Sequence, residues 1–425
     1  MPVAPVPPAI GLVSPCGWGN LGDAAIQDAM IQNLRARIPG ARLIGITLNP
    51  PDTTARHGIP AFPLSARPRP GRWVAAPASP ATGDAKPSAV REALKRVPLV
   101  RPLVLAGRRA LEPVAAELKH AAGAFRLART LDLLVVSGGG QLDDKWGGPW
   151  GGPYDLWKWT LLARAAGARV AFASVGAESL NSRSSRVMAR AALRTAAYRS
   201  YRDGASKQVI QDLGVGPDDP VVADLAFSLP GRWPPAPGRT PATVGVSPMA
   251  YCDPRSWPRK DEAIYRAYLR TLADAVTSLR AQGHSVVLFT SDHPDRRSVD
   301  DVLALLPPET AAAPRIESLD DLLRVLASVD LVIASRLHGV LLALLVGRPV
   351  LALAYHRKVR DQMNALGLAD HCLDIEGPTP TTIVSRLNAL AAQAPALGPA
   401  IAARTAALQT ALAGQYDRLV ALAAG

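Results

Sequence analysis

Basic side chains and histidines gather at the ends of two apolar runs in the last third of the chain. The first run leads into Arg336 and His338, and the second leads into His356 and Lys358, with further arginines beside them. The apolar stretch 340–346 between them predicts a buried helix. Ligands of open α/β sheets bind beyond the carboxyl ends of the strands. This strand–helix–strand unit is therefore expected to present cations and imidazoles to an anionic substrate and to move protons.

The spacing within this segment supports a shared site. Arg336 and His338 are two residues apart, and alternate residues of an extended chain point to the same side. A lone histidine is usually structural, but one beside an arginine at a strand end favours a functional role. Histidine can donate or accept a proton near neutral pH. Lys358 can neutralise or protonate a leaving phosphate, although taken alone it would be read as a solvated surface lysine.

A second charged pair, Arg202-Asp203, lies between a short predicted strand and a helix. Asp203 or Ser206 can simply cap that helix, and Arg202 can simply pair with Asp224. The alternative is a functional arginine, because a guanidinium binds carboxylate or phosphate with two parallel hydrogen bonds and keeps its charge.

Two glycine-rich turns follow predicted strands. The first, Gly17-Trp-Gly-Asn-Leu-Gly-Asp23, contains Asn20 and has the glycine spacing of a dinucleotide fingerprint, but no acidic residue ends the second strand. It is either a tight turn with a capping Asp23 or an anion site at a helix N-terminus. The second, Ser137-Gly-Gly-Gly140, ends the most apolar strand of the first half, where open backbone favours a ligand over a simple turn.

The elements repeat on both sides of a proline-rich stretch. Strands alternate with helices before and after residues 231–242, which read as a linker because proline excludes helix. This pattern predicts an α/β protein with two Rossmann-like domains facing across a cleft, 1–230 and 243–425. The first contains a Pro/Arg-rich insertion at about 51–102, and the second ends in helices.

Composition narrows the classes of partner. The chain has 48 Lys and Arg against 35 Asp and Glu, a net charge of +13, which favours anionic partners. The excess is scattered, and helix-turn-helix, zinc-finger and basic–aromatic patterns are lacking, so we expect no nucleic acid. Three cysteines without metal-like spacing predict no metal or cofactor and a reducing compartment. No signal peptide or membrane span is visible, which suggests a cytoplasmic protein, with the basic region 91–129 able to contact the inner membrane face.

Taken in order, these motifs resemble the polysaccharide pyruvyl transferase family. A mild departure is His356-Arg357, where the family has a shorter version containing Asp. The matching stretches run through nearly the whole chain: Gly19-Asn-Leu-Gly-Asp23, Ser137–Gly140, Tyr201-Arg-Asp-Gly-Ala-Ser206, Leu213-Gly-Val215, Ala223-Asp-Leu-Ala-Phe227, Ser335-Arg-Leu-His-Gly339 and Ala354-Tyr-His-Arg-Lys358.

The resemblance implies a GT-B-like fold and transfer of pyruvate from phosphoenolpyruvate to two saccharide hydroxyls as a cyclic ketal. It also implies that Arg336, His338, Lys358 and Asp203 lie in the active site. On this hypothesis His338 is the general acid and base, Lys358 or Arg336 stabilises the departing phosphate, and Asp203 deprotonates a hydroxyl or orients a base. The residues expected to bind phosphoenolpyruvate are Arg336, Arg202, Gly139 and Gly140.

The acceptor, free or lipid-linked, is expected to contact the first glycine loop and the segment after the second. The residues predicted there are Asn20, Asp23, Gln141 and Trp146. An aromatic residue such as Trp146 can stack on a sugar ring. The main competing hypothesis is a GT-B glycosyltransferase that uses a nucleotide sugar. That enzyme would need a carboxylate for the ribose, for which Glu317 and Asp320 are loose candidates.

Overall fold

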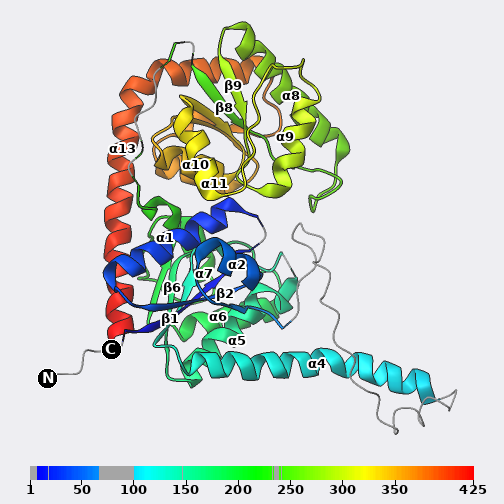
Figure 1. Cartoon of the computed structure of the whole chain (residues 1–425), viewed down its shortest axis with the longest axis vertical. Coiled ribbons are helices and arrows are strands. Elements are labelled where there is room, and N and C mark those ends of the chain that lie inside the picture. The colour runs from blue at the N-terminus through cyan, green and yellow to red at the C-terminus, as the bar shows by residue number, and fades with distance from the viewer. Residues whose placement is uncertain are drawn as a thin grey trace.

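The computed structural model contains two parallel β-sheets, each covered by helices on both faces (Figure 1). It describes residues 7–17, 19–66, 100–145, 147–231, 233, 239–240 and 242–425, with only the backbone at 100–111. The N-terminal sheet has the order β3-β2-β1-β4-β6-β5, with β7 also paired to β6. The C-terminal sheet has the order β12-β11-β10-β8-β9.

The strands of the first sheet are β1 Ala9–Ser14, β2 Arg42–Thr47, β3 Ala61–Pro63, β4 Leu133–Ser137, β5 Gly140–Leu142, β6 Arg169–Ala177 and β7 Tyr198–Tyr201. The helices that belong to it are α1 Leu21–Arg37, α2 Pro50–His57, α4 Val100–Ala128, α5 Gly152–Ala165, α6 Arg183–Arg194 and α7 Gly204–Gln211, with 3-10 turns η2 Gly148–Trp150 and η3 Leu225–Ser228.

The strands of the second sheet are β8 Thr243–Ser247, β9 Ser285–Leu288, β10 Leu331–Ala334, β11 Val350–Ala354 and β12 Cys372–Asp374. Its helices are α8 Glu262–Ala281, α9 Arg296–Leu303, α10 Leu319–Ser328, α11 Leu337–Leu345, α12 Arg357–Ala365 and α13 Pro380–Ala424, with 3-10 turns η4 His293–Asp295 and η5 Ala369–His371.

Alternating burial explains why apolar runs became central strands. In β4, Leu133 and Val135 face one apolar cluster while Leu134 and Val136 face another. The residues of β10 divide in the same way between the first of these clusters and a third one. A strand with apolar residues on both faces is stable only between two covering layers, which is why such strands read as continuous hydrophobic runs.

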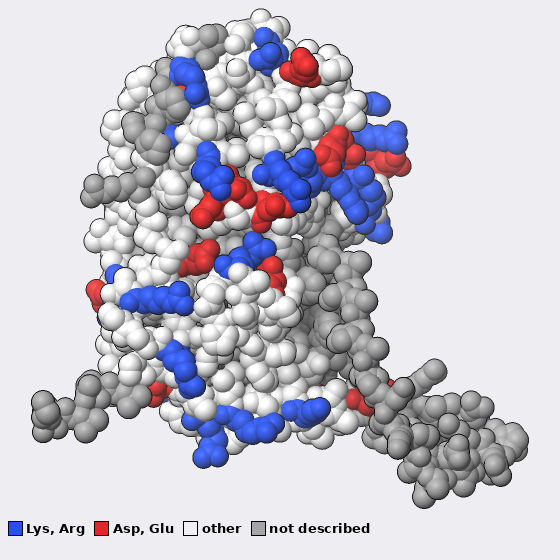
Figure 2. Space-filling model, in the orientation of Figure 1, with Lys and Arg blue, Asp and Glu red and all other residues white. Residues whose placement is uncertain are grey.

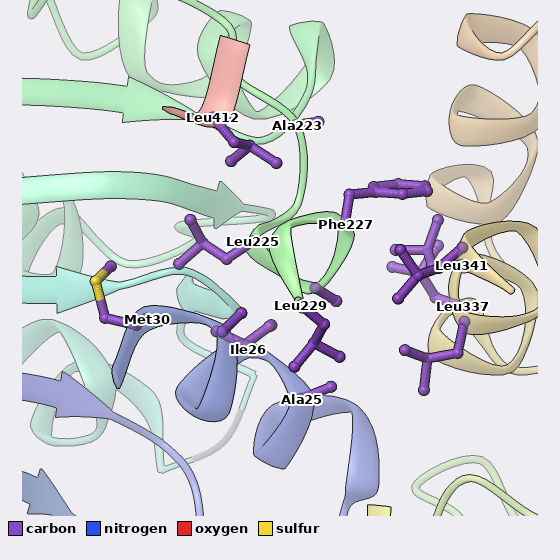
Figure 3. Packing of buried hydrophobic residues seen from close by; sticks show 14 of the residues in the cluster. Ala25, Ile26, Met30, Ala223, Leu225, Phe227, Leu229, Leu337, Leu341 and Leu412 are labelled. Atoms are coloured by element: carbon purple, nitrogen blue, oxygen red, sulfur yellow. The ribbon is translucent and has the colours of Figure 1, made fainter. Parts of the chain in front are cut away.

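One apolar cluster joins the two domains. It contains Ile26 of α1, Phe227 of η3, Leu341 of α11 and Leu412 of α13, all at most 1% exposed (Figure 3). The N-terminal and C-terminal sheets thus share a core on one side of the space between them. Shared apolar burial of this kind holds domains more firmly than a polar contact surface does.

Helix α13 is the second connection between the domains. It runs along one side of both (Figure 1), and its final turns pack on the N-terminal sheet. Buried Gln415 accepts hydrogen bonds from Tyr198 and Ser200 and donates one to Ser174. The last residues of the range 243–425, which was predicted as the C-terminal domain, therefore pack on the N-terminal domain and complete it. The boundaries near residues 230 and 243 stay predictions.

The insertion predicted at 51–102 was wrong in its first part. Residues 50–57 form α2, which is capped by Asn49, and residues 61–63 add the edge strand β3. Pro51, the first proline of the predicted insertion, stands in the first turn of α2, where proline lacks only an N–H that would be unpaired anyway. Residues 67–99 lie outside the described part. The strand predicted at 221–223 is reduced to one bridge between Tyr201 and Val221.

None of the described helices is long and apolar enough to cross a bilayer. On the face in Figure 2, positive and negative side chains are intermingled over the C-terminal domain. The net charge of +13 is therefore not concentrated there, in agreement with the many ion pairs of this domain.

Candidate active site

A cavity of about 380 Å³ lies where the carboxyl ends of strands from both sheets face each other. Most of its charged lining comes from strand ends and helix starts, as expected for an open α/β sheet. Its lining residues are Pro15, Asn20, Asp23, Gly140, Asp143, Lys145, Glu178, Arg202, Tyr251, Trp257, Pro258, Arg259, Ser291, Asp292, Arg336, Leu337, His338, Tyr355, His356 and Lys358.

Arg336 stands between β10 and α11 and is held by two carboxylates. Its Nε and Nη2 donate to the two oxygens of Asp295 at 2.6 and 2.8 Å, and Nη2 lies 3.4 Å from Asp292. Its guanidinium also lies 5.5 Å from the centre of the Trp257 ring. Burial alone would lower the pKa of Arg336, but Asp295 and Asp292 hold it above its ordinary value. The guanidinium is therefore fixed in place and always charged.

His338 occupies the first turn of α11 and faces the N-terminal domain. Its Nε2 lies 3.7 Å from Asp224 Oδ2, which is longer than a hydrogen bond but within the range of an ion pair. Both atoms are buried. Burial would raise the pKa of Asp224, but His338 and Arg202 hold it below its ordinary value. Asp224 is thus an ionised carboxylate aimed at the imidazole, an arrangement that can orient a general acid and base.

The backbone of α1 supports the other side of this imidazole. A Cβ atom on Gly22 would stand 2.1 Å from Cγ and Nδ1 of His338, so only glycine fits. Backbone bonds beside this contact join the domains: Leu21 N donates to Ser291 O, and His293 N donates to Gly19 O, each at 3.0 Å. The first glycine loop therefore docks on the C-terminal domain and presses against a predicted catalytic residue.

Lys358 stands at the start of α12 and points across the cavity. Its Nζ lies 3.4 Å from Glu178, which follows β6, and 5.4 Å from the centre of the Tyr355 ring. Glu178 also pairs with Lys145 and lies 3.8 Å from His356. Burial would raise the pKa of Glu178, but these cations lower it to about 2. The carboxylate is therefore ionised, and its ion pair with Lys358 connects the two domains.

Tyr355 ends β11 beside the same cations. Burial raises the pKa of its hydroxyl, but Lys358 and Arg336 outweigh burial and bring it below the ordinary value. The Tyr355 ring contacts Trp257 edge-on, with ring centres 5.8 Å apart. This phenol therefore lies between the cationic and aromatic parts of the cavity.

Arg202 is the cation that the N-terminal domain contributes from the end of β7. Its guanidinium lies flat on Gly176, where a Cβ would come within 2.6 Å of it. Nε donates to Asp203 at 3.3 Å, and Nη1 lies 3.8 Å from Asp224. The side chain is only 5% exposed, so its neighbours hold the arginine in place.

The structure thus brings together seven of the predicted site residues: Asn20, Asp23, Gly140, Arg202, Arg336, His338 and Lys358. The side-chain oxygen of Asn20 caps α1 by accepting from Gly22 and Asp23 N–H groups. That leaves its amide nitrogen for a ligand.

Three other predicted residues have different surroundings. Asp203 caps α7 through the Ser206 N–H and binds Arg202, so both of its oxygens are engaged. The Gln141 amide donates to three backbone carbonyls, among them Gly138 at 2.7 Å, and holds the ends of β1 and β4. Gly139 shapes the turn with a φ of 69°. None of the three lines the cavity, and Trp146 lies outside the described residues.

Sequence reasoning missed several residues of the cavity. Glu178 follows β6 directly, whereas the sequence predicts a strand over 169–174 that ends four residues before it. Trp257 lies in a proline-containing segment without periodicity. Tyr355 stands in a motif that was recognised, and its position at a strand end was the available signal.

A separate cluster lies behind the first glycine loop. The Sγ of Cys16 is 3.3 Å from Nε2 of His57, whose Nδ1 is 2.6 Å from Asp28. A thiol, a histidine and an aspartate in this sequence of contacts resemble a catalytic Cys-His-Asp triad. However, Cys16 is only 1% exposed, and its pKa is raised, mainly by burial. The cluster therefore fixes α2 to α1. Among the described residues no group of three His, Cys, Asp or Glu side chains is arranged to hold a metal ion.

Comparison with solved structures confirms the predicted fold. A structure described as the glycotransferase of kitacinnamycin matches with a TM-score of 0.53 and 16% identity, covering 99% of this chain and all of that one. The UDP-GlcNAc 2-epimerase from Methanocaldococcus jannaschii matches with a TM-score of 0.51 and 8% identity, covering 89% and 91%. These likenesses show two Rossmann-like domains in a GT-B-like arrangement and nothing about substrate.

Comparison of sequences identifies the family. No curated protein matches the chain significantly. The family profile described as polysaccharide pyruvyl transferase matches residues 20–357, which include every described residue that lines the cavity except Pro15 and Lys358. The chain therefore belongs to the polysaccharide pyruvyl transferase family.

Proposed function

We propose that the protein transfers pyruvate from phosphoenolpyruvate to two hydroxyls of a saccharide, forming a cyclic ketal and releasing phosphate. One observation carries the proposal: Arg202, Arg336 and Lys358 converge from both domains on a cavity that is also lined by His338, which Asp224 contacts from behind. Phosphoenolpyruvate is small and carries a carboxylate and a phosphate, which match a cluster of fixed cations.

The three cations contribute to donor binding in different ways. Lys358 pairs with Glu178 at 3.4 Å and lies over the Tyr355 ring, and an incoming phosphate would replace the contact with Glu178. Arg336 has Nε and Nη2 engaged by Asp295, which leaves Nη1 to contact one ligand oxygen. Arg202 and the backbone at Gly140 contribute from the N-terminal side. The donor is thereby held between the domains, with its reactive C2 and C3 close to His338.

The reaction is balanced in protons without a further acid. His338 protonates C3, and C2 becomes an electrophile that the first sugar hydroxyl attacks. Phosphate then leaves, and the second hydroxyl closes the ring. The two hydroxyls lose two protons, of which one replaces the proton given to C3 and the other leaves on phosphate. Asp224 holds His338 for this exchange, and Asp203 acts by positioning Arg202. No step is routed through a metal ion.

The test measures phosphate release from phosphoenolpyruvate with a panel of simple and lipid-linked glycosides, and identifies the ketal product by mass spectrometry. Wild-type protein should release phosphate only with a suitable acceptor. The substitution His338→Ala should lower the rate about 10²- to 10⁴-fold, and the variant should still bind phosphoenolpyruvate. Normal turnover by His338→Ala would remove this residue from its role.

The glycosyltransferase hypothesis has less support from the geometry. Glu317 and Asp320, its candidate ribose ligands, are exposed at the start of α10 and do not line the cavity. Stabilisation by a nucleotide sugar, but not by phosphoenolpyruvate, in a thermal-shift measurement would reverse this ranking.

A further inference from the structure

One wall of the cavity is aromatic and comes entirely from the C-terminal domain. Tyr251, Trp257 and Tyr355 all line the cavity. The ring of Trp257 contacts Tyr251 at 5.9 Å and Tyr355 at 5.8 Å between centres, in both cases edge-on. Pro258 and Arg259 continue this wall toward the exposed rim. We call these three rings and the two rim residues the aromatic wall.

The loop that carries the wall is held in shape by its own hydrogen bonds. Trp257 N donates to Asp253 O at 2.8 Å, and the Asp253 carboxylate, 1% exposed, accepts from the side chain of Arg255. The hydroxyl of Tyr251 donates to Glu376. Pre-formed surfaces bind with a smaller loss of conformational entropy than mobile ones.

The cavity is thus divided between two kinds of chemistry. Arg202, Lys358 and the helix starts form its cationic part, which the proposed donor fills because it carries two anionic groups. The aromatic wall has little to offer such a donor. A sugar ring instead presents a face of C–H groups that packs on an aromatic ring and a rim of hydroxyls that need polar partners. Asn20, Asp23 and Asp143 on the opposite, N-terminal wall can supply those partners.

We infer that the aromatic wall is the acceptor subsite, and that a pyranose ring of the acceptor packs on the indole of Trp257 while its hydroxyls face the N-terminal wall. The inference rests on the proposed function for the identity of the second substrate. Tyr355 contacts both Trp257 and Lys358. The acceptor hydroxyls would therefore meet the donor beside Tyr355. Acceptor choice would thus be set mainly by the loop 249–260.

The variant that tests this is Trp257→Leu, with Trp257→Phe as the conservative form. Trp257 lies against Arg336, but the bidentate bond to Asp295 holds that guanidinium independently of the indole. Trp150→Leu is the matched control, because Trp150 is 70% exposed and does not line the cavity. Phosphoenolpyruvate affinity, measured by thermal shift, should stay within about twofold of wild type in all three variants.

The readout is saturation-transfer NMR with the methyl pyranosides of glucose, mannose and galactose, which needs no turnover. Wild type and Trp150→Leu should transfer saturation to the ring protons of the preferred sugar. Trp257→Leu should lose the signal and raise the acceptor KM at least tenfold, and Trp257→Phe should lie between them.

The outcomes separate the two proposals. Unchanged sugar binding by Trp257→Leu, or an equal loss of donor affinity, would overturn the acceptor subsite. Sugar binding that depends on Trp257 without any phosphate release from phosphoenolpyruvate would leave the subsite standing and overturn the proposed donor chemistry.

Discussion

His338 and Asp224 come from different domains, and the position of each depends on its neighbours, Gly22 for His338 and Arg202 for Asp224. Asp224 lies between Arg202 and His338 and keeps its charge despite complete burial. Such a buried carboxylate favours one orientation and one tautomer of the imidazole. The acid and base function that we propose for His338 is therefore a property of the pair.

Replacing this carboxylate tests the pair. Asp224→Asn keeps the shape but removes the charge, so the rate at saturating substrates should fall at least about 10²-fold while the KM for phosphoenolpyruvate changes little. Steady-state kinetics give both values. Asp417→Asn, which removes an exposed partner of Arg37, is the control and should behave as wild type. An equal rise in KM and fall in rate would instead point to general damage.

The Tyr355 hydroxyl provides a direct measure of the electrostatics. Its pKa lies below the ordinary value because Lys358 and Arg336 outweigh burial. Lys358→Met removes the cation with the larger effect on this pKa and should move the ionisation of Tyr355 to higher pH. Ultraviolet absorbance of the phenolate follows the titration, and the difference between wild type and Tyr355→Phe isolates this residue. A titration that Lys358→Met leaves unchanged would contradict the assigned cause. Tyr265→Phe, remote from the cavity, should keep the transition.

At the scale of elements, the contact between α1 and α11 decides the position of the His338 imidazole. Gly22→Ala would place a methyl group 2.1 Å from the His338 ring, a distance that forces one of the two to move. We expect at least a tenfold loss of phosphate release and a lower melting temperature. Circular dichroism and the phosphate assay measure these effects.

The matched control for that substitution is Gly414→Ala. Gly414 lies in α13 with nothing within 4 Å of the added Cβ, so alanine should stabilise the helix by about 0.5 to 1 kcal/mol. Activity should stay at the wild-type level. If both variants lost activity alike, the effect of Gly22→Ala could not be attributed to His338.

Elements with strong periodicity were predictable from the sequence, and short edge elements were not. The sequence predicts a strand over 131–136 and a helix over 261–282, and β4 and α8 lie within a residue or two of these limits because apolar patterning and caps define them. Helix α12 was not predicted, since Arg357 to Ala365 is mostly polar and depends on the His356 cap and on tertiary contacts. The early end predicted for β6 hid Glu178, whose importance follows only from its neighbours across the cleft.

At the scale of the whole molecule, an ion pair in the cavity lining connects the two domains. Glu178 pairs with Lys358 of the C-terminal domain, and its pKa falls from an ordinary 4.5 to about 2 in the folded state. A carboxyl group whose pKa is lowered by folding stabilises the protein above its unfolded pKa, and this contribution is lost as the pH falls through the folded value. Its size is on the order of 2 kcal/mol.

Acid unfolding should reveal this contribution. The free energy of unfolding of the wild type should fall between about pH 4.5 and 2, and Glu178→Gln should show a shallower slope over that window. Glu262→Gln, at a 61% exposed side chain, is the control and should keep the wild-type slope. Urea titrations at a series of pH values give the slopes. Identical slopes for wild type and Glu178→Gln would show that other groups dominate.

The arrangement of two domains and the cationic strand ends could be predicted because they repeat a local pattern twice. The aromatic wall could not, since Trp257 reaches the cavity only through the folding of an irregular loop. The intramolecular hydrogen bonds of Gln141 and Asp203 could not be predicted either. In a sequence, a polar residue after a strand has the same appearance whether it binds a ligand or the backbone.

The course of α13 also constrains how the protein is made. Tyr416, Leu419 and Ala423 are buried in the cluster that covers the N-terminal sheet, although they are synthesised after both sheets. The domain that leaves the ribosome first therefore keeps an uncovered apolar face until α13 has been made. Nascent chains stopped before residue 405 should be recognised by chaperones and cleaved by proteases within the N-terminal domain, and extension of the chain beyond residue 424 should end this sensitivity. Helix α13 thus links its own synthesis to the completion of the N-terminal domain.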